Sequence, residues 1–280
     1  MVANWELVLR LKERREQVGV SVNDLTNEFR FTRNYWSAIE NERKIVPEKT
    51  LRSLFTMFEF SEEDCEQLLQ LREIAKENGW WNQYSALFDG ELQRLFGLEH
   101  GAQGIRDYET LLIPGLLQTA EYARAIMNSD ATVRQVEVEQ RVAVRLRRQE
   151  RLRGGNPAYL TVIMSEAALR QQIGGRAVLR GQLEHLLATM EEFPDNVEIR
   201  VIPFAATACT LFGAGTMRLL DFHSPRLPRV AWLESVSTRA VITDPTRVRD
   251  ITIAFNEALE RTLDTRRTKE TINRCRKELT

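Results

Sequence analysis

Cysteine and histidine are scarce in this chain, which limits the chemistry open to it. The three cysteines, Cys65, Cys209 and Cys275, lie far apart and form no CxxC pair. An odd number at such spacing argues against a disulfide framework and is typical of a reducing compartment. The three histidines are equally scattered, and no zinc-ligand spacing occurs. The sequence thus indicates neither a disulfide-rich domain nor a metal centre, and it predicts no cofactor.

Long apolar runs and a strong net charge are also missing. No stretch approaches the roughly 18 apolar residues of a membrane span. The charged start, MVANWELVLRLKERREQ, does not have the pattern of a cleavable signal. The formal net charge is -1, so nucleic-acid binding would have to rest on a local patch. We expect a cytoplasmic protein without a membrane partner.

The pattern along the 280 residues predicts a multidomain chain. Residues 1–77 read as a bundle of five short helices. Residues 78–104 read as a linker, but one that carries Trp80 and Trp81. Because exposing two tryptophans is unfavourable, we expect this linker to be docked. Residues 105–280 read as a larger α+β domain for regulation and dimerisation.

The α+β domain has one predicted sheet of about five strands. Helical patterning runs from about residue 91 to 152, and a last helix spans about residues 244–261, followed by a polar tail. Alternating and β-branched segments predict the strands. The strand segments are YLTVIM, VEIRVIPF, TMRLLDF, VAWLE and RAVIT.

The segment SVNDLTNEFRFTRNYWSAIENER, residues 21–43, has the spacing of a helix-turn-helix. Ser21 and Thr32 are suited to cap its two helices, and apolar residues at helical spacing supply a core. The second helix, about residues 32–40, would then present its first turn to a DNA major groove. Arg and Asn are the side chains that pair bidentately with guanine and adenine, and basic residues after the helix suit phosphates. The predicted DNA-binding residues are Thr32, Arg33, Asn34, Tyr35, Ser37, Ala38, Arg43 and Lys44.

This segment resembles the Xre or phage-repressor type of helix-turn-helix. It departs from that pattern at several positions. Arg30 stands where the turn has glycine, which places a non-glycine residue at a position of positive φ. Glu42 replaces the glycine after the third helix, Thr26 a small alanine and Val22 a glutamine. The apolar spacing sets the fold, whereas the DNA sequence specificity does not transfer.

The charge of the first 60 residues leaves an alternative open. They hold ten Lys or Arg against nine Asp or Glu, so the domain is barely basic, and a helical bundle for protein contact remains the competing interpretation. One short recognition helix reads few base pairs. We therefore expect double-stranded DNA as the partner of a homodimer, which doubles the site and offsets weak intrinsic affinity.

The string IPGLLQTAEYARAIM, residues 113–127, is the most unusual in the chain. Pro114-Gly115 suits a type II turn, and Thr119 is suited to cap the helix that follows. Together with GWW, RLRRQERL, SEAALR, QLEHLL, VEIRVIPF and WLE, this string is similar to a family of actinobacterial regulators. Members of that family join an Xre-type domain to a C-terminal domain of unknown function.

That resemblance implies a transcriptional regulator, often described as antitoxin-like and encoded beside a small partner protein. The C-terminal domain would sense a small-molecule effector or capture the partner. Six arginines in RVAVRLRRQERLR, residues 141–153, form either a solvated face or a site for phosphate, an acidic partner or DNA. The candidate effector or partner residues are Trp80, Trp81, Gln118, Arg148, Gln149, Glu166 and Glu234.

An enzyme is the third interpretation. Glu166 and Glu234 each directly follow a predicted strand and are suited to a general acid–base pair. No nucleophile with a base, phosphate loop or metal cluster accompanies them, so we expect no enzyme. The glycines of CTLFGAGTM lack the GxGxxG spacing and predict only a turn before a strand.

Overall fold

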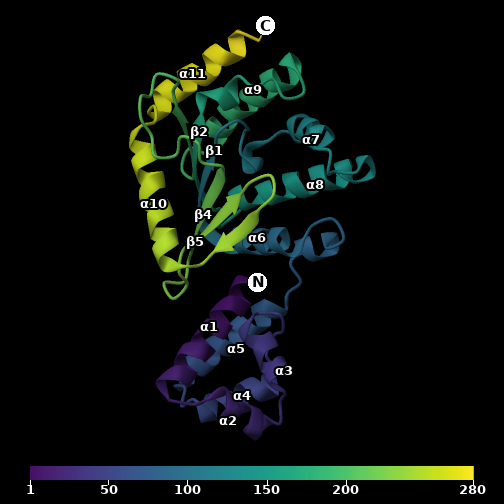
Figure 1. Ribbon diagram of the computed structural model, residues 1–280, viewed down its shortest axis with the longest axis vertical. Coiled ribbons are helices and arrows are strands. Elements are labelled where there is room, and N and C mark those ends of the chain that lie inside the picture. Colours follow the sequence, from purple (N-terminus) through teal and green to yellow (C-terminus); the bar gives the residue numbers. More distant parts are fainter. Residues whose placement is uncertain (280) are drawn as a thin grey trace. The chain divides into compact units, whose positions relative to one another are not determined.

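The computed structural model describes residues 1–279 and divides them into two compact units (Figure 1). The first unit spans Met1–Asn82, and the second begins at Gln83. Each unit has its own hydrophobic core. The chain is therefore multidomain, as the pattern predicts.

The first unit is a bundle of five helices, as predicted. The helices are α1 (Val2–Gln17), α2 (Val22–Phe29), α3 (Arg33–Glu40), α4 (Glu48–Met57) and α5 (Glu62–Lys76). Leu7, Leu25, Trp36, Leu51 and Leu68 meet in the core and are almost fully buried. Because these helices are short, their stability comes from packing of the apolar faces rather than from helix propensity.

The second unit is an α+β domain with a mixed sheet of six strands. Their order is β3-β2-β1-β4-β5-β6, with β1, β2 and β3 parallel and the others antiparallel. The strands are β1 (Ala102–Glu109), β2 (Tyr159–Ser165), β3 (Val197–Ile202), β4 (Thr216–Phe222), β5 (Val230–Glu234) and β6 (Arg239–Ile242). The α-helices are α6 (Gly90–Gly101), α7 (Ala120–Ser129), α8 (Val138–Gln149), α9 (Arg176–Glu192), α10 (Pro245–Glu260) and α11 (Thr265–Lys277). The 3-10 turns of this region are η1 (Trp80–Tyr84), η2 (Gly115–Leu117), η3 (Gln135–Glu137), η4 (Glu150–Leu152) and η5 (Glu166–Leu169).

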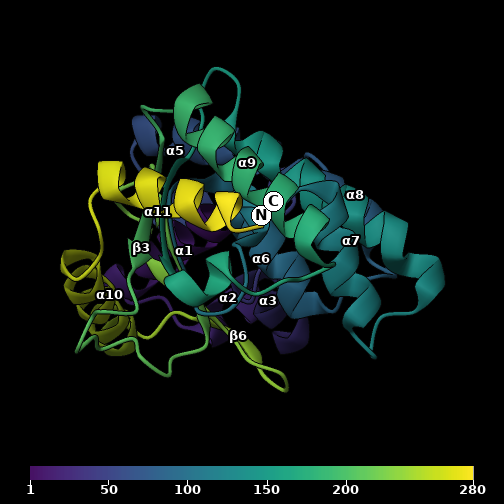
Figure 2. The same ribbon diagram turned by 90° about the horizontal axis from the view of Figure 1, so that it is seen from above.

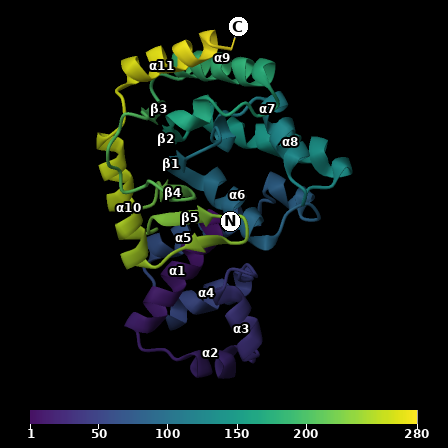
Figure 3. The same cartoon turned by 45° about the horizontal axis from the view of Figure 1, so that its top comes forward.

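Helices cover both faces of this sheet (Figures 1 and 3). On one face Val248, Phe255 and Ala258 of α10 pack against apolar side chains of the strands. Helices α6, α7 and α8 lie on the opposite side. Helix α11 runs beside α9 (Figure 2), and the ion pair Arg276–Glu184 joins them at 3.2 Å. These layers are what a sheet buried on both faces requires.

Two elements of this domain differ from the prediction. Strand β1, in the middle of the sheet, was predicted as helix because Arg106, Asp107 and Glu109 break the apolar alternation. The charges are tolerated because Arg106 pairs with Asp221 and Asp107 with Arg218, both far away in the sequence. The sheet consequently has six strands rather than about five.

The predicted polar tail is in fact a helix, α11. Asp264 caps it by accepting a hydrogen bond from Arg267 N at 2.7 Å. Its buried face carries Thr268, Thr271, Ile272 and Cys275, at the spacing of one helical stripe. The sequence pattern does not indicate this buried face, because two of its four residues are threonines rather than apolar residues.

Residues 78–104, the predicted linker, divide between the two units. Trp80 and Trp81 pack edge to face, with ring centroids 5.8 Å apart, and Trp81 is buried. A Cβ on Gly79 would lie 2.2 Å from the Trp81 ring, so the close approach requires glycine there. Helix α6, at the other end of this stretch, belongs to the second unit. Among the described residues, no helix has the length and apolarity that a membrane crossing needs.

Candidate DNA-binding helix and polar core of the C-terminal domain

Side-chain caps set the boundaries of α2 and α3. Ser21 Oγ accepts from Asp24 N at 3.2 Å while Ser21 N donates to Asp24 Oδ2 at 2.8 Å, which is a reciprocal capping box. Thr32 Oγ1 accepts from Tyr35 N at 3.1 Å and so begins α3. The two helices therefore start where the sequence predicts.

Arg30 forms the turn between these helices in a left-handed conformation, with φ 52° and ψ 34°. Glu42, at the second position where glycine is expected, has φ 60°. Each such residue costs on the order of 1 kcal/mol relative to glycine. Aromatic packing holds the turn, since Phe29 stacks on Phe31 at 5.5 Å and Phe31 packs on Tyr35 at 4.8 Å.

Helix α3 has one buried and one exposed face. Trp36 and Ile39 are 1% exposed and belong to the core. The predicted outward residues follow the opposite face: Thr32, Arg33, Asn34 and Ser37 are exposed, and Tyr35 and Ala38 are half-buried. Arg43 and Lys44 are exposed just after the helix. Arg33, Asn34 and Ser37 thus lie on the side of α3 away from the core.

Local contacts orient several of these side chains. Arg33 Nη2 donates to Asn23 Oδ1 of α2 at 2.7 Å, and Lys44 lies over the Tyr35 ring at 5.0 Å. Asn41 Nδ2 donates to the backbone oxygen of Ser37 at 2.7 Å. Asn23, which the sequence pattern does not indicate, therefore helps to position Arg33.

Four other arginines of this unit hold the bundle together. Arg14 Nε donates to Phe58 O at 2.8 Å, Arg15 to Val20 O at 3.0 Å and buried Arg72 to Val46 O at 2.8 Å. Arg10 pairs with Asp64. Exposed Arg30 instead lies at the α2–α3 turn. Four exposed basic residues thus stand in or next to α3 in the chain, Arg30, Arg33, Arg43 and Lys44, which we call the basic cluster.

In the second unit, three glutamines bind the backbone of the segment that follows β1. Gln118 Nε2 donates to Ile113 O at 2.6 Å, Gln149 Nε2 to Gln118 O at 2.7 Å and Gln182 Nε2 to Leu117 O at 2.6 Å. Gln182 Oε1 also accepts from Thr119 N at 2.7 Å. Gln118 and Gln149, predicted as effector or partner residues, are here internal supports. Gln182 was not singled out, although it stands in the QLEHLL motif.

The predicted type II turn at Pro114-Gly115 is wrong. A type II turn needs positive φ at Gly115, but Gly115 is not among the residues of positive φ and instead begins the 3-10 turn η2. Glycine at this position instead leaves room for a side chain of α8. A Cβ would lie 2.9 Å from Arg145 Nη1, so a larger residue would displace that guanidinium. Thr119 caps α7, as expected.

Arg148 is part of a buried ion network on the α8 side of the sheet. Its Nε and Nη2 donate to the two oxygens of Glu99 at 2.7 and 2.8 Å. Arg218 Nη1 donates to Glu99 Oε2 at 2.7 Å, and Arg218 Nε to Asp107 Oδ2 at 3.1 Å. The two arginines lower the pKa of Glu99 against the effect of its burial. Burial raises the pKa of Asp107, which Arg218 opposes.

Most other arginines of the 141–153 segment also have internal partners. Arg141 pairs with Glu137 at 2.9 Å, Arg151 donates to Ala102 O at 2.7 Å and Arg153 lies over the Phe193 ring at 5.2 Å. This segment is thus neither a free basic face nor a simple solvated one. It anchors α8 to its surroundings.

Glu166 directly follows β2 and Glu234 ends β5, and each carboxylate has its own ion pair. Glu166 pairs with Arg170 at 3.0 Å and accepts from Phe204 N at 3.0 Å, while Glu234 pairs with Arg239 at 2.8 Å. Strands β1 and β4 separate β2 from β5. At about 4.8 Å per strand this is roughly 14 Å. The structure does not bring the two carboxylates together.

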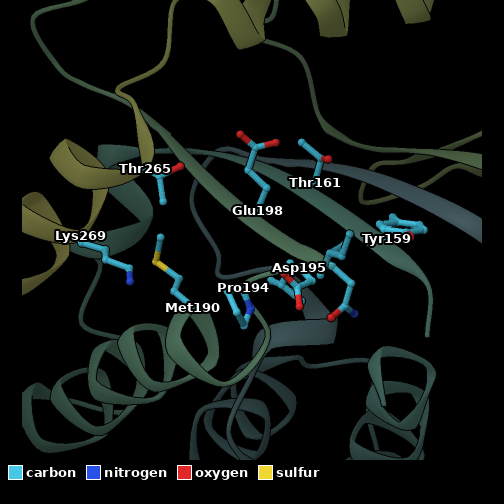
Figure 4. A pocket seen from close by; sticks show the side chains of 11 residues that line it. Tyr159, Thr161, Met190, Pro194, Asp195, Glu198, Thr265 and Lys269 are labelled. Carbon is cyan, nitrogen blue, oxygen red and sulfur yellow. The ribbon is translucent and has the colours of Figure 1, made fainter. Parts of the chain in front are cut away.

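A pocket of about 460 Å³ opens where β2 and β3 begin (Figure 4). Its polar lining includes Asp195, Glu198, Thr265 and Lys269. Glu198 already pairs with Arg200 at 2.9 Å. The remaining charges are of opposite sign, so the lining selects no charge class of ligand. Among the described residues, no three His, Cys, Asp or Glu side chains gather as metal ligands.

Comparison with known families agrees with these two units. Residues 6–68 match a family model described as "Helix-turn-helix domain", and residues 92–274 match one described as "Domain of unknown function (DUF5753)". No curated protein and no solved structure matches the chain. The helix-turn-helix match supports a DNA-binding regulator. Because the second match covers more than half of the sequence, the chain belongs to the DUF5753 family, here preceded by a helix-turn-helix domain.

Proposed function

We propose that the protein is a sequence-specific transcriptional regulator of the Xre type, working in the cytoplasm, in which α3 enters the DNA major groove. The observation that carries this is the shared exposed face of α3. Arg33 and Asn34 occupy its first turn, where base-contacting residues of a recognition helix stand. The basic cluster beside them suits phosphates on either side of the groove.

We further propose that the protein binds DNA as a homodimer through its C-terminal domain. An eight-residue recognition helix reads few base pairs, and two copies give a symmetric site with half-sites about one helical turn apart. The antitoxin-like and actinobacterial resemblance of the sequence supports a regulator that also senses an effector or a partner.

Selection from a random duplex pool tests both proposals. We expect enrichment of an inverted repeat, protected as two footprints on one face of the DNA. The size of the free protein, measured by light scattering, should be that of two chains. Enrichment of a single short half-site by a monomer would contradict the dimer, and no enrichment would contradict sequence-specific binding.

A second candidate function, capture of a small partner protein, is favoured by exposed apolar side chains. Leu111, Phe204, Phe212 and Val236 are 52% exposed or more. They follow β1, β3 and β5 or precede β4, and the strand directions place these positions at one end of the sheet. Monomeric proteins rarely gather such residues without a partner.

Co-purification from the native host separates the two functions of the C-terminal domain. A stoichiometric small protein that is lost with Phe204→Ser and Phe212→Ser, but kept with Ile253→Ser elsewhere, supports capture. Its absence leaves effector sensing as the favoured role. We propose no catalytic role for Glu166 and Glu234, because roughly 14 Å, or three strand spacings, separates their strands.

A further inference from the structure

Arg145 of α8 is a partly buried cation without an ion pair. Its neighbours Arg148 and Arg218 share the carboxylates of Glu99 and Asp107. Within the described part of the chain, Arg145 pairs with no carboxylate, and its one hydrogen bond runs from Nη1 to Gln118 Oε1 at 3.0 Å. The network therefore balances two arginines with two acids and leaves one positive charge.

The position of this guanidinium is fixed from two sides. Gln118 is itself held by its bond to Ile113 O, and Gly115 lies so close that a Cβ there would be 2.9 Å from Arg145 Nη1. Among residues 1–279, no acceptor pairs with Nε or Nη2 of Arg145, and neither nitrogen is fully buried. Both are therefore free to donate.

The groups that face Arg145 from the neighbouring elements do not neutralise it. Glu109 of β1 and Glu234 of β5 are close enough to raise its pKa, but burial and the two nearby arginines outweigh them and lower that pKa to about 10. Glu109 has its own bond, accepting from Thr216 Oγ1 at 2.8 Å. Asp107 Oδ1 is buried without a partner. Incompletely satisfied polar groups thus gather near the end of β1.

We propose that Arg145 binds the carboxylate of a small monoanionic ligand at the carboxyl end of β1, with Gln118 fixing the guanidinium. A guanidinium with two free N–H groups suits the two oxygens of a carboxylate. One unbalanced positive charge fits a monoanion, whereas it would leave one charge of a phosphate dianion unmatched. Strand ends of this kind are where ligands bind in open α/β sheets. The proposal rests on the proposed sensing role and gives its ligand class.

Thermal unfolding of the full chain with probe anions tests this site without DNA. The probes are acetate, propionate and benzoate, with chloride as the reference and inorganic phosphate as a separate arm, all at constant ionic strength. We expect a saturable rise in Tm with at least one carboxylate and none with phosphate, since only a ligand bound to the folded state stabilises it.

Variants then assign the effect to Arg145. Arg145→Gln should weaken the carboxylate response by about tenfold or more, as losing a charge-assisted contact does. Gly115→Ala keeps the arginine but crowds its guanidinium, and it should weaken the response if Arg145→Gln fails to fold. Arg180→Gln, an equal change of charge at an exposed position of α9, should leave the response unchanged.

Three results would overturn the proposal: no carboxylate gives a saturable response, phosphate alone does, or the response survives both Arg145→Gln and Gly115→Ala. Failure of the carboxylate site and failure of the proposed regulator function give different results. Carboxylate binding in a protein that selects no DNA sequence would preserve this site and contradict the regulator. Sequence-specific DNA binding without any carboxylate response would do the reverse.

Discussion

Asp107 and Arg218 lie directly opposite each other on β1 and β4, and Arg218 also binds Glu99 of α6. All three side chains are at most 5% exposed. The centre of the sheet is therefore held to a helix by charge as well as by apolar packing. Removing one member of such a network leaves the others buried without a counter-charge.

Arg218→Met should for this reason destabilise the C-terminal domain by about 3–5 kcal/mol. Urea unfolding followed by circular dichroism measures the change. Arg249→Met, which removes an exposed pair with Asp250, should cost about 1 kcal/mol or less. Equal effects of the two substitutions would mean that the buried network contributes no more than a surface pair.

Glu109 makes the stability of the same domain depend on pH. Burial, together with the charge of Asp107, raises the pKa of Glu109 from its ordinary 4.5 to about 8. Between these values the folded state holds a proton that the unfolded state has released, so stability falls as the pH rises from about 4.5 to about 8. The contribution is fully present below the lower value and lost above the upper one.

Glu109→Gln keeps the hydrogen-bonding shape but cannot ionise. We expect a smaller decline of Tm between pH 5 and pH 8 than in the wild type, and a higher Tm than the wild type at the alkaline end. Glu192→Gln, an exposed change of the same kind, serves as the control. Parallel pH profiles of the wild type and Glu109→Gln would show that Glu109 titrates normally.

Gln182 is expected to be needed for the turn after β1. Replacing it by Ala leaves Leu117 O and Thr119 N without their partner, which costs roughly 1–3 kcal/mol for buried groups. Gln172→Ala, at an exposed position, should change little. A loss in Gln182→Ala no greater than in this control would show that water replaces the amide.

The overall fold followed from the sequence, because apolar spacing and caps are local signals. Ser21 and Thr32 begin helices where their side chains predict, and α10 (Pro245–Glu260) has nearly the bounds predicted for the last helix. Strand β1 could not be predicted in this way, since its core charges make sense only beside Arg218, 111 residues away. The candidate effector or partner residues were harder to predict, because the sequence does not show what a polar side chain contacts. Gln118 has a side chain suited to ligand binding, but its amide donates to Ile113 O inside the domain.

Substitution of Arg30 should distinguish its effect on the stability of the α2–α3 turn from its effect on DNA binding. Arg30→Gly relieves a left-handed residue and should stabilise the first unit by up to about 1 kcal/mol, as should Glu59→Gly, whose φ is 55°. Only Arg30→Gly removes a member of the basic cluster. It alone should weaken DNA binding and make the slope of log binding constant against log salt concentration shallower by about one. Equal DNA affinities of the two variants would exclude a phosphate contact by Arg30.

The central claim, that α3 reads DNA through Arg33, is tested most directly by a gel shift on the protein's own promoter across a salt series. Wild-type binding should weaken steeply as salt rises. Arg33→Ala should weaken the free energy of DNA binding by about 1–3 kcal/mol and relax discrimination at one base. Lys12→Ala, an equal loss of charge at an exposed position of α1, should do neither. Unchanged affinity and unchanged base preference in Arg33→Ala would contradict the assignment of α3 as the recognition helix.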